Sequence, residues 1–292
     1  MTPLWQEITS QISSASGEPF DIRARHSQGG GCINQAFVLQ GKSSHWFVKL
    51  NSSDRLDMFT AEAEGLKALD KPGAIRVPRP LVWGASHGYS YLVMEHVPMV
   101  GHLNPEQFGR QLATLHQCWQ PYFGWQRDNT IGATPQENTP GDKWAEFWRV
   151  HRLEFQLELA RSNGAPPSLL DKGMKLASQT ARFFISHSPR ASVLHGDLWS
   201  GNWGADTHDN PVIFDPAVYF GDHETDLAMM LLFGNPGEAF FAGYREVYPI
   251  DSGFAIRKTF YNLYHILNHF NLFGGGYAHQ AEGMIDRLLS EL

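Results

Sequence analysis

Hydrophobic residues in the first third of the chain fall mostly in short runs of the kind that forms β-strands. These runs cover residues 20–25, 32–40, 45–50, 81–84 and 89–95. Helical spacing occurs in two places: Leu4, Ile8 and Ile12 recur on one helix face, and residues 57–70 present one apolar side. We therefore expect antiparallel β structure with one main internal helix.

Apolar residues take on helical spacing in the rest of the chain. Asn104 and Pro105 form a cap followed by a helix-starting proline. Further helical patterns cover residues 144–161, 169–187, 225–233, 257–273 and 277–292, with short strands at 193–195 and 212–215. We expect an α+β fold with two lobes: a small, mainly antiparallel β lobe at residues 1–95 and a larger, mostly helical lobe at residues 96–292.

Composition and charge exclude several classes of protein. The 292 residues carry a formal charge of −7 without a run of like charges, which argues against a nucleic-acid or anionic-membrane surface. Cys32 and Cys118 are too few for a disulfide framework and lack zinc-ligand spacing. The N-terminus lacks signal-peptide features, and the apolar run at 227–233 is far shorter than the roughly 20 residues that span a bilayer. We expect a soluble cytoplasmic protein.

A glycine cluster in the stretch QGGGCINQAF lies between two predicted strands. Without Cβ atoms, Gly29, Gly30 and Gly31 let backbone N–H groups approach an anion such as a phosphate. A flexible hairpin turn explains the cluster equally well, since the stretch lacks the GxGxxG pattern.

Lys49 stands within the strand pattern HWFVKL. Alternation places Phe47 and Lys49 on one face of the strand and Trp46 and Val48 on the other. The lysine is therefore either a residue at the sheet edge that reaches solvent or a cation placed for a ligand. In the helix that follows, Glu62 or Glu64 could pair with it.

The stretch YLVMEHVPM ends a buried strand with a short polar and apolar segment. Such a segment is typical of a hinge between two lobes, and its backbone could hydrogen-bond a flat heterocycle. An ordinary strand end is the alternative.

Oxygen ligands gather in VLHGDLWSGNWG and VIFDPAVYFGDHETDLAM. Asp197 and Asn202 follow the first of the two short strands, and Asp215 stands at the end of the second. Hard oxygen donors in this number bind Mg²⁺ together with substrate phosphates.

The order of these features resembles the eukaryotic-type kinase fold: a glycine-rich loop, a strand lysine, a helix glutamate, the VMEHV hinge, HxDxxxxN, and an aspartate after a strand. The motifs HGDLWSGNW, DPAVYFGDHETDLAM, GGGCINQAF and MFTAEAEGLKAL are more similar to the fructosamine-3-kinase (ketosamine kinase) family, relatives of the aminoglycoside phosphotransferases. FGWQRDNTIGATPQEN and the following WAEFWRVHRLEFQL resemble that family too. The similarity extends over nearly the whole chain.

The resemblance implies roles for the candidate residues. Asp197 would orient or accept the proton of a sugar hydroxyl that attacks the γ-phosphoryl group of ATP, and Asn202 and Asp215 would hold Mg²⁺. Lys49, positioned by Glu62, would grip the α- and β-phosphates. The remaining nucleotide contacts would come from the amides of Gly29, Gly30, Gly31, Cys32 and Ile33 and from Met94, Glu95 and Val97 at the hinge.

The sequence differs from protein kinases in two motifs, and these differences lead to further predictions. Gly196 stands where protein kinases have the arginine of HRD, and Asp215-Pro216-Ala217 replaces DFG. The interval between Asp215 and Asp226 is too short for a phosphorylated activation loop. We expect a constitutively assembled small-molecule kinase in which Asp226 braces the catalytic loop.

The family similarity implies a ketosamine substrate, free or protein-bound, phosphorylated on the sugar 3-hydroxyl. Six residues near the site in sequence could present aromatic and acidic groups to it, although packing or capping explains each of them as well: Trp199, Trp203, Tyr219, Asp222, His223 and Glu224. An aminoglycoside or choline kinase is the second hypothesis. A catalytically silent nucleotide-binding protein is the third, disfavoured because every expected ATP and Mg²⁺ residue is present.

Cys32 carries a separate hypothesis. The amide dipoles of the glycine cluster would favour its thiolate, and a Cys32–Cys32 bridge would make a redox-sensitive homodimer of an otherwise monomeric protein. A small apolar strand residue is the alternative.

Overall fold

The computed structural model describes residues 2–29 and 33–292, which form two compact units. The first comprises Met1–Leu103 and Gly204–Asp215, and the second comprises Asn104–Trp203 and Pro216–Leu292. Gly30, Gly31 and Cys32 lie outside the described residues, and so do the predictions made for them.

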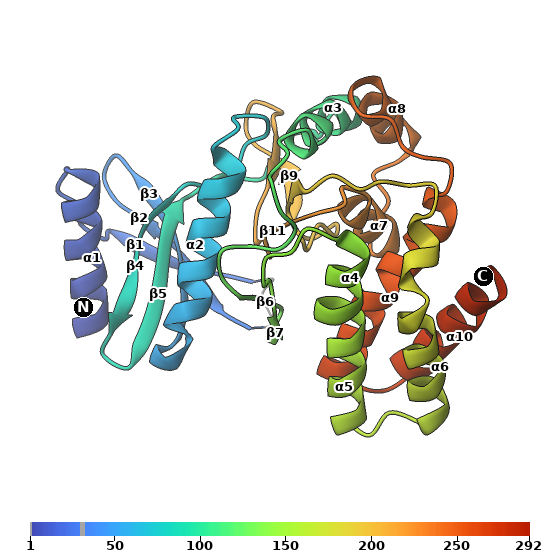
Figure 1. The fold of residues 1–292 in the computed structure, drawn as a ribbon. Coiled ribbons are helices and arrows are strands. Elements are labelled where there is room, and N and C mark those ends of the chain that lie inside the picture. Colours follow the sequence, from blue (N-terminus) through green and yellow to red (C-terminus); the bar gives the residue numbers. More distant parts are fainter. Residues whose placement is uncertain (1, 30–32) are drawn as a thin grey trace. The chain divides into compact units, whose positions relative to one another are not determined.

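The first unit is a five-stranded antiparallel sheet with one helix on each face (Figure 1). The strand order is β1-β2-β3-β5-β4. Its elements are α1 (Pro3–Ser16), β1 (Ala24–Gln28), β2 (Gln35–Gln40), β3 (His45–Ser52), the 3₁₀ turn η1 (Ser53–Arg55), α2 (Leu56–Asp70), β4 (Pro80–Ser86) and β5 (Tyr89–Glu95). The predicted β region with one main internal helix is confirmed.

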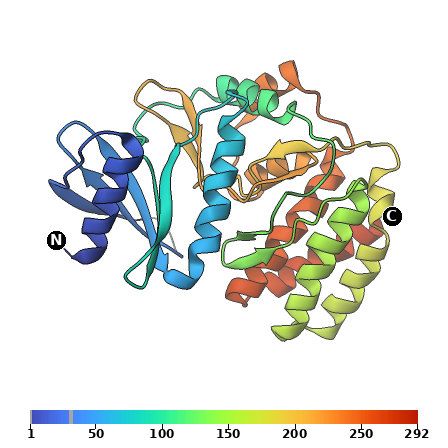
Figure 2. The ribbon, with the colours of Figure 1, turned by 60° about the vertical axis from the view of Figure 1, so that its left-hand side comes forward.

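Alternation along β3 sends its side chains to two different surroundings. Val48 and Leu50 are buried in the core that α1 covers, together with Ile8 and Ile12. Lys49 points to the opposite face, where it pairs with Glu62 of α2. Figure 2 shows α1 and α2 on the two sides of this sheet.

The first unit extends past the predicted boundary between residues 95 and 96. It also includes a β-hairpin from later in the chain. Strands β9 (Trp203–Ala205) and β10 (Pro211–Ile213) pair with each other. The Gly101 N–H donates to Ala205 O at 3.2 Å, and the Ile213 N–H donates to Arg76 O at 3.0 Å. These backbone bonds join residues 204–215 to the sheet unit, although the sequence placed them in the helical lobe.

The second unit is mostly helical, as predicted. Its helices are α3 (Pro105–His116), α4 (Trp144–Trp148), the π-helix η2 (Arg149–Glu154), α5 (Phe155–Ser162), α6 (Pro167–Ser178), the 3₁₀-helix η3 (Thr180–Phe184), α7 (Glu224–Leu232), α8 (Glu238–Val247), α9 (Phe254–Phe273) and α10 (Tyr277–Ser290). Its strands are β6 (Asn129–Ile131), β7 (Thr134–Gln136), β8 (Ser192–Leu194) and β11 (Tyr219–Gly221). Helix α8 and the strands β6, β7, β9 and β11 were not predicted.

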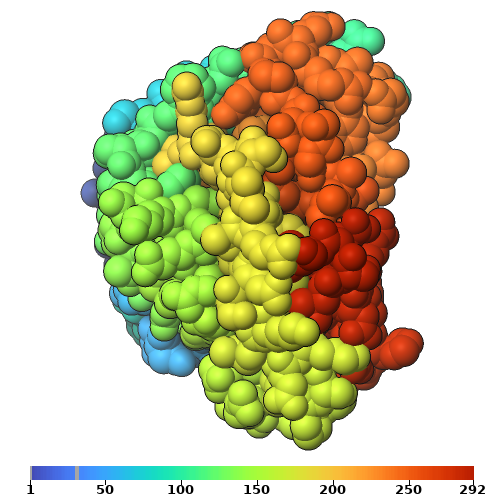
Figure 3. All heavy atoms as spheres, turned by 45° about the vertical axis from the view of Figure 1, so that its right-hand side comes forward, coloured from blue at the N-terminus to red at the C-terminus, as the bar shows by residue number. Residues whose placement is uncertain are grey.

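Helices α6 and α10 meet along one face of this unit, which Figure 3 presents. Lys172 of α6 joins them at the surface through Glu282 at 3.1 Å and Asp286 at 2.9 Å, both on α10. Beneath this surface, α9 supplies buried aromatic residues such as Phe260, Tyr261 and Tyr264. Among the described residues, no helix combines the length and hydrophobicity that a membrane crossing requires.

Helices α3 and α8 cross at two glycines. A Cβ on Gly109 would lie 2.1 Å from Phe240 O, and one on Gly243 would lie 2.2 Å from Glu106 O. The helix backbones can touch only because these positions lack side chains. The close approach also brings Tyr244 of α8 within reach of His116 at the end of α3.

Replacing Gly109 with alanine tests this packing. Because the new Cβ would overlap a backbone carbonyl, Gly109→Ala should lower the free energy of unfolding by about 1–3 kcal/mol, measured by urea denaturation. The matched control is Gly283→Ala in α10, where nothing lies within 4 Å of an added Cβ. The control should be stabilised by up to about 1 kcal/mol, since alanine favours helix over glycine. Equal effects of the two substitutions would contradict the close crossing.

Candidate active site

Lys49 is a buried cation held between two carboxylates of the first unit. Its Nζ donates to Glu62 Oε1 and to Asp215 Oδ1, each at 2.6 Å, and the residue is only 6% exposed. Burial alone would lower the pKa of Lys49, but Asp215 and Glu62 raise it above its usual value. Lys49 therefore stays charged, and of the two glutamates that the sequence offered, Glu62 is its partner.

The two carboxylates differ in exposure. The Glu62 side chain is 10% exposed, and burial raises its pKa despite the nearby Lys49 ammonium. The Asp215 side chain is 44% exposed, and its backbone has a φ of 57°. A non-glycine residue in the left-handed region is uncommon outside turns and functional sites. This geometry aims the Asp215 carboxylate at Lys49.

The predicted hinge residues lie close to Lys49 in the same sheet. Met94 is paired with Phe47 across the β3–β5 ladder, two positions along the strand from the Lys49–Leu92 pair. The Glu95 N–H already donates to Arg79 O at 2.9 Å. The Glu95 N–H is therefore already bonded within the first unit. Val97 is buried, and Gly29 and Ile33 are exposed between β1 and β2.

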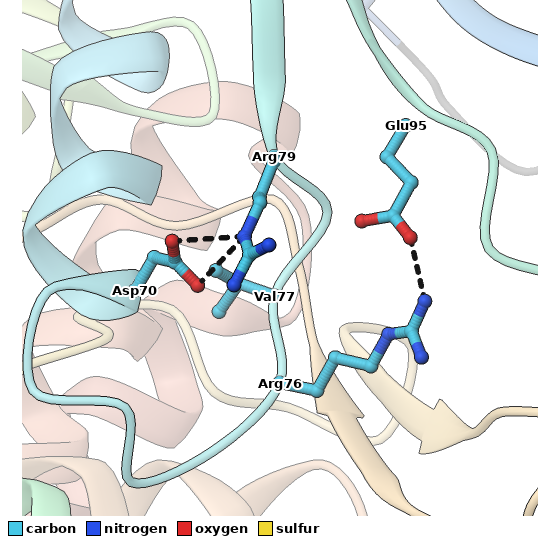
Figure 4. Close-up of a pocket in the computed structure, with 5 residues that line it drawn as sticks. All are labelled: Asp70, Arg76, Val77, Arg79 and Glu95. Carbon is cyan, nitrogen blue, oxygen red and sulfur yellow. Dashed lines mark hydrogen bonds and ion pairs between the residues drawn. The ribbon is translucent and has the colours of Figure 1, made fainter.

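Arg76 connects Glu95 of the predicted hinge to the β9–β10 hairpin. Its guanidinium donates to Glu95 Oε1 at 2.6 Å and to Asp206 Oδ2 at 2.7 Å. Figure 4 shows the contact with Glu95 at a pocket of about 240 Å³ that Asp70, Val77 and Arg79 also line. Arg79 in turn binds Asp70. Each arginine that lines this pocket is paired with a carboxylate. We therefore interpret the pocket as a structural contact within the first unit rather than as a binding site.

In the second unit, Asp226 holds the backbone of the loop that carries Asp197. Its Oδ2 accepts from the His195 N–H at 2.7 Å, and its Oδ1 accepts from the Gly196 N–H at 2.9 Å. His116 Nε2 also bonds Oδ2 at 3.2 Å, while His116 Nδ1 bonds the Tyr244 hydroxyl at 2.7 Å. Burial alone would raise the pKa of Asp226, but His116 and the backbone donors hold it below its usual value. Asp226 is thus an internal brace of the loop, as the sequence predicted.

Gly196 is required at its position for steric reasons. Its φ is 84°, and an added Cβ would lie 2.1 Å from Ala217 O. The Ala217 N–H donates to His195 O at 2.9 Å, so the two segments run in close contact. The arginine of HRD could not occupy this site.

Asn202 is oriented by the same loop. Its Nδ2 donates to Asp197 O at 2.9 Å and to Asp197 Oδ2 at 3.3 Å, and the residue is 5% exposed. With the amide nitrogen committed, Oδ1 is the atom that Asn202 can offer to a cation.

The three aromatic and hydroxyl-bearing substrate candidates differ in accessibility. Trp199 is 39% exposed and lies over Gly201, where a Cβ would lie 2.3 Å from the indole ring. Trp203 packs on Phe108 with ring centroids 5.5 Å apart. Tyr219 is 3% exposed. Of these three, Trp199 is the one that can reach a solute.

Asp222, His223 and Glu224 are buried and have partners within the second unit. Asp222 Oδ2 accepts from Tyr261 at 2.6 Å and from His187 at 2.8 Å, and Glu224 forms a bidentate pair with Arg257 at 2.7 and 2.9 Å. His223 is stacked on Tyr248 with centroids 4.1 Å apart. Packing, which the sequence had left open for these residues, accounts for their contacts.

His187, Asp222 and Glu224 also have ligand atoms within 4.8 Å of one another, a spacing that could suit a metal ion. Arg257 already occupies both oxygens of Glu224, and Tyr261 and His187 share one oxygen of Asp222. A cation would have to displace the guanidinium. We therefore interpret the group as an internal ion-pair cluster.

The fructosamine kinase family model matches residues 4–291. The chain belongs to this family. A Synechocystis protein named "Probable ketoamine kinase" is 47% identical to this fructosamine kinase family member over 291 residues, 98% of this chain and 97% of its own. A rice protein named protein-ribulosamine 3-kinase, chloroplastic, is 40% identical, covering 100% of this chain and 86% of its own.

Solved structures agree with the family assignment. The crystal structure of a Haemophilus somnus protein assigned to the fructosamine-3-kinases superposes with a TM-score of 0.88 at 28% identity, covering 98% of this chain and 97% of its own. The α+β, protein-kinase-like fold and the resemblance predicted from the motifs are both confirmed. This fructosamine kinase family member is a phosphotransferase.

The ion pair of His187 predicts a pH-dependent stability. Burial favours the neutral ring, but the hydrogen bond and charge of Asp222 raise the pKa of His187 above its usual 6.5. A raised histidine pKa stabilises the fold below the unfolded-state pKa, and that gain disappears as pH rises through the folded-state pKa. His187→Gln should therefore lower the free energy of unfolding by about 1–3 kcal/mol below pH 6, and by less at pH 8.

Denaturant unfolding at several pH values measures this loss. His279→Gln, at an exposed position of α10, is the control and should leave the pH profile unchanged. A His187→Gln effect of the same size at pH 5 and pH 8 would exclude a charged pair.

Proposed function

We propose that this chain is an ATP- and Mg²⁺-dependent ketosamine 3-kinase, which phosphorylates the 3-hydroxyl of the sugar in a fructosamine or ribulosamine. One observation carries the proposal: 40% identity along the whole chain to a protein whose name specifies ribulosamine and the 3-position. The family match supports the same substrate class. We expect a cytoplasmic enzyme that acts on free or protein-bound ketosamines.

The buried cation supports the nucleotide half of the proposal. Lys49 keeps its charge at neutral pH and is ordered by two carboxylates, so it could exchange one of them for a phosphate oxygen without rearranging the strand. Glu62 would keep the ammonium in place during this exchange. The amides of residues 29–33 would cover the phosphates, and Met94, the Glu95 carbonyl and Val97 would border the adenine.

Asn202 and Asp215 have the donor chemistry that Mg²⁺ requires. Both offer oxygen atoms: Asn202 a carboxamide oxygen and Asp215 a half-exposed carboxylate. Oxygen donors supplied by a few side chains and by substrate phosphates are the usual environment of this ion. When bound, Mg²⁺ would neutralise charge on the transferred phosphoryl group.

Asp197 would supply the base. It would accept the proton of the sugar hydroxyl while that oxygen bonds to the γ-phosphorus and the bond to the bridging β–γ oxygen breaks, releasing ADP. Asp226 would keep the Asp197 backbone in register through the two N–H groups that it binds. Catalysis would rest on positioning and charge neutralisation.

Trp199 is the side chain best placed to present an aromatic surface to the sugar, since it is exposed and stands two residues after Asp197 in the same loop. Trp203, Tyr219, Asp222, His223 and Glu224 would then support the site by packing. The redox hypothesis for Cys32, and with it the choice between monomer and bridged homodimer, stays a prediction.

A substrate panel tests the proposed function. Purified protein with MgATP is given ribuloselysine, fructoselysine, an aminoglycoside or choline, and ADP release is followed by a coupled assay. We expect turnover with the two ketosamines alone, and a fall in kcat of about 10²–10⁴ in Asp197→Asn, the range for loss of a general base.

Asp171→Asn is the control and should retain full activity. It makes the same chemical change at an exposed position of α6. Trp199→Ala should raise the KM for the ketosamine while the KM for ATP stays unchanged. Turnover of choline or the aminoglycoside in preference to both ketosamines would overturn the substrate assignment.

A further inference from the structure

The stretch NTIGATPQEN, residues 129–138, is a β-hairpin with an unusual number of buried polar side chains (Figure 1, β6 and β7). Gln136 is 1% exposed and Asn138 is 0% exposed. Burying an amide is unfavourable unless its donors and acceptors find partners. The partners of these side chains therefore show what the hairpin holds in place.

Two of the amides bind the backbone of one distant segment. Asn129 Nδ2 donates to Val218 O at 2.8 Å, and Gln136 Nε2 donates to Ala217 O at 3.2 Å. Ala217 and Val218 are the second and third residues after Asp215. The hairpin thus grips the chain immediately beyond the proposed metal ligand.

The amides are themselves oriented by a buried network. Gln136 Oε1 accepts from the Tyr264 hydroxyl at 2.8 Å, and Asn129 Oδ1 accepts from Gln136 at 2.8 Å and from Asn138 at 2.9 Å. Each acceptor oxygen is occupied, so each NH₂ group is directed at its carbonyl. Networks of this kind fix a single geometry when every member has partners.

Arg152 anchors the network from the π-helix η2. It is fully buried, and its guanidinium donates to Asn138 Oδ1 at 2.7 Å and to Glu137 O at 2.6 Å. Its Cζ lies 4.3 Å from the Tyr219 ring centroid and 4.8 Å from that of Phe147. A π-helical turn is rare and places this one cation against the hairpin and β11 together.

The gripped segment is held from its other side by the catalytic loop. The Ala217 N–H donates to His195 O at 2.9 Å, and Tyr219 is paired with Leu194 across the β8–β11 ladder. Ala217 is therefore fixed through its N–H by the loop that carries Asp197 and through its carbonyl by Gln136.

We propose that the β6–β7 hairpin is a permanent clamp on the segment after Asp215, with Asn129 and Gln136 as positioning residues for phosphoryl transfer and Arg152 as their anchor. In protein kinases the corresponding part of the chain is a long loop that phosphorylation orders through new charge contacts. Here side-chain amides make equivalent contacts in the folded chain. The clamp rests on the proposed function and would give the expected constitutive activity a structural basis.

Hydrogen exchange measured by mass spectrometry tests the clamp without substrate, nucleotide or metal. Gln136→Met keeps the length of the side chain but removes its donor to Ala217 O and the acceptor of the Tyr264 hydroxyl, and Asn129→Asp replaces a donor with an acceptor that faces Val218 O. In both variants the amides of residues 217–220 should exchange at least about tenfold faster, while those of α9 stay unchanged. The kcat for the ketosamine should fall about tenfold, with the KM for that substrate changed less than threefold.

Gln117→Met is the matched control, since Gln117 Nε2 donates to the backbone carbonyl of Val247 at 2.9 Å, outside the network of the clamp. It should leave the exchange of residues 217–220 within twofold of the wild type. If Asn129→Asp does not fold, Asn129→Ser takes its place.

Unchanged exchange at residues 217–220 in folded Gln136→Met would overturn the clamp, and faster exchange with unchanged kcat would overturn its role in the reaction. Failure of the wild type to phosphorylate any ketosamine would defeat the proposed function but leave the exchange result standing.

Discussion

The buried ammonium of Lys49 is the constraint that organises the first unit. A cation in the face of a sheet is stable only with counter-charges, and it has two at 2.6 Å, Glu62 and Asp215. The first requires α2 to lie with its glutamate toward the sheet. The second requires the chain to return, after residues 104–203 of the second unit, and bring residues 204–215 back to the same sheet. The two ion pairs of Lys49 thus act together with the backbone bonds of Gly101 and Ile213 in placing α2 and the β9–β10 hairpin.

In the second unit, the loops at the ends of β8 and β11 are held in place with little help from regular secondary structure. Strands β8 and β11 are only three residues long, so backbone pairing alone cannot position the loops at their ends. The unit uses buried side chains instead: Asp226 binds two N–H groups of the loop that carries Asp197, and Asn129 and Gln136 bind two carbonyls of the segment after Asp215. Because these side chains bond directly to backbone groups of the loops, the loops are held in place as soon as the chain is folded.

Sequence patterns predicted the features that depend on periodicity and on chemical type. The alternation around Lys49, the helix that carries Glu62 and the brace by Asp226 all follow from spacing or motif order. The sequence did not reveal that residues 204–215 join the first unit, because that depends on the contacts of Arg76, Gly101 and Ile213 across long intervals. Three-residue strands are too short to show a period. Acidity near the site suggested Asp222 and Glu224 as substrate contacts, yet their burial depends on Tyr261 and Arg257, which lie far away in the sequence.

Binding of MgADP to Lys49 variants tests the central claim most directly. Isothermal titration calorimetry would compare the wild type with Lys49→Met and with Lys49→Met/Glu62→Gln. The second substitution removes the buried Glu62 carboxylate that Lys49→Met leaves without its ammonium partner, and so guards against misfolding. The account predicts that both folded variants bind MgADP at least about tenfold more weakly, a loss of about 1.4 kcal/mol or more. An affinity within twofold of the wild type in either folded variant would show that the nucleotide does not depend on this ammonium.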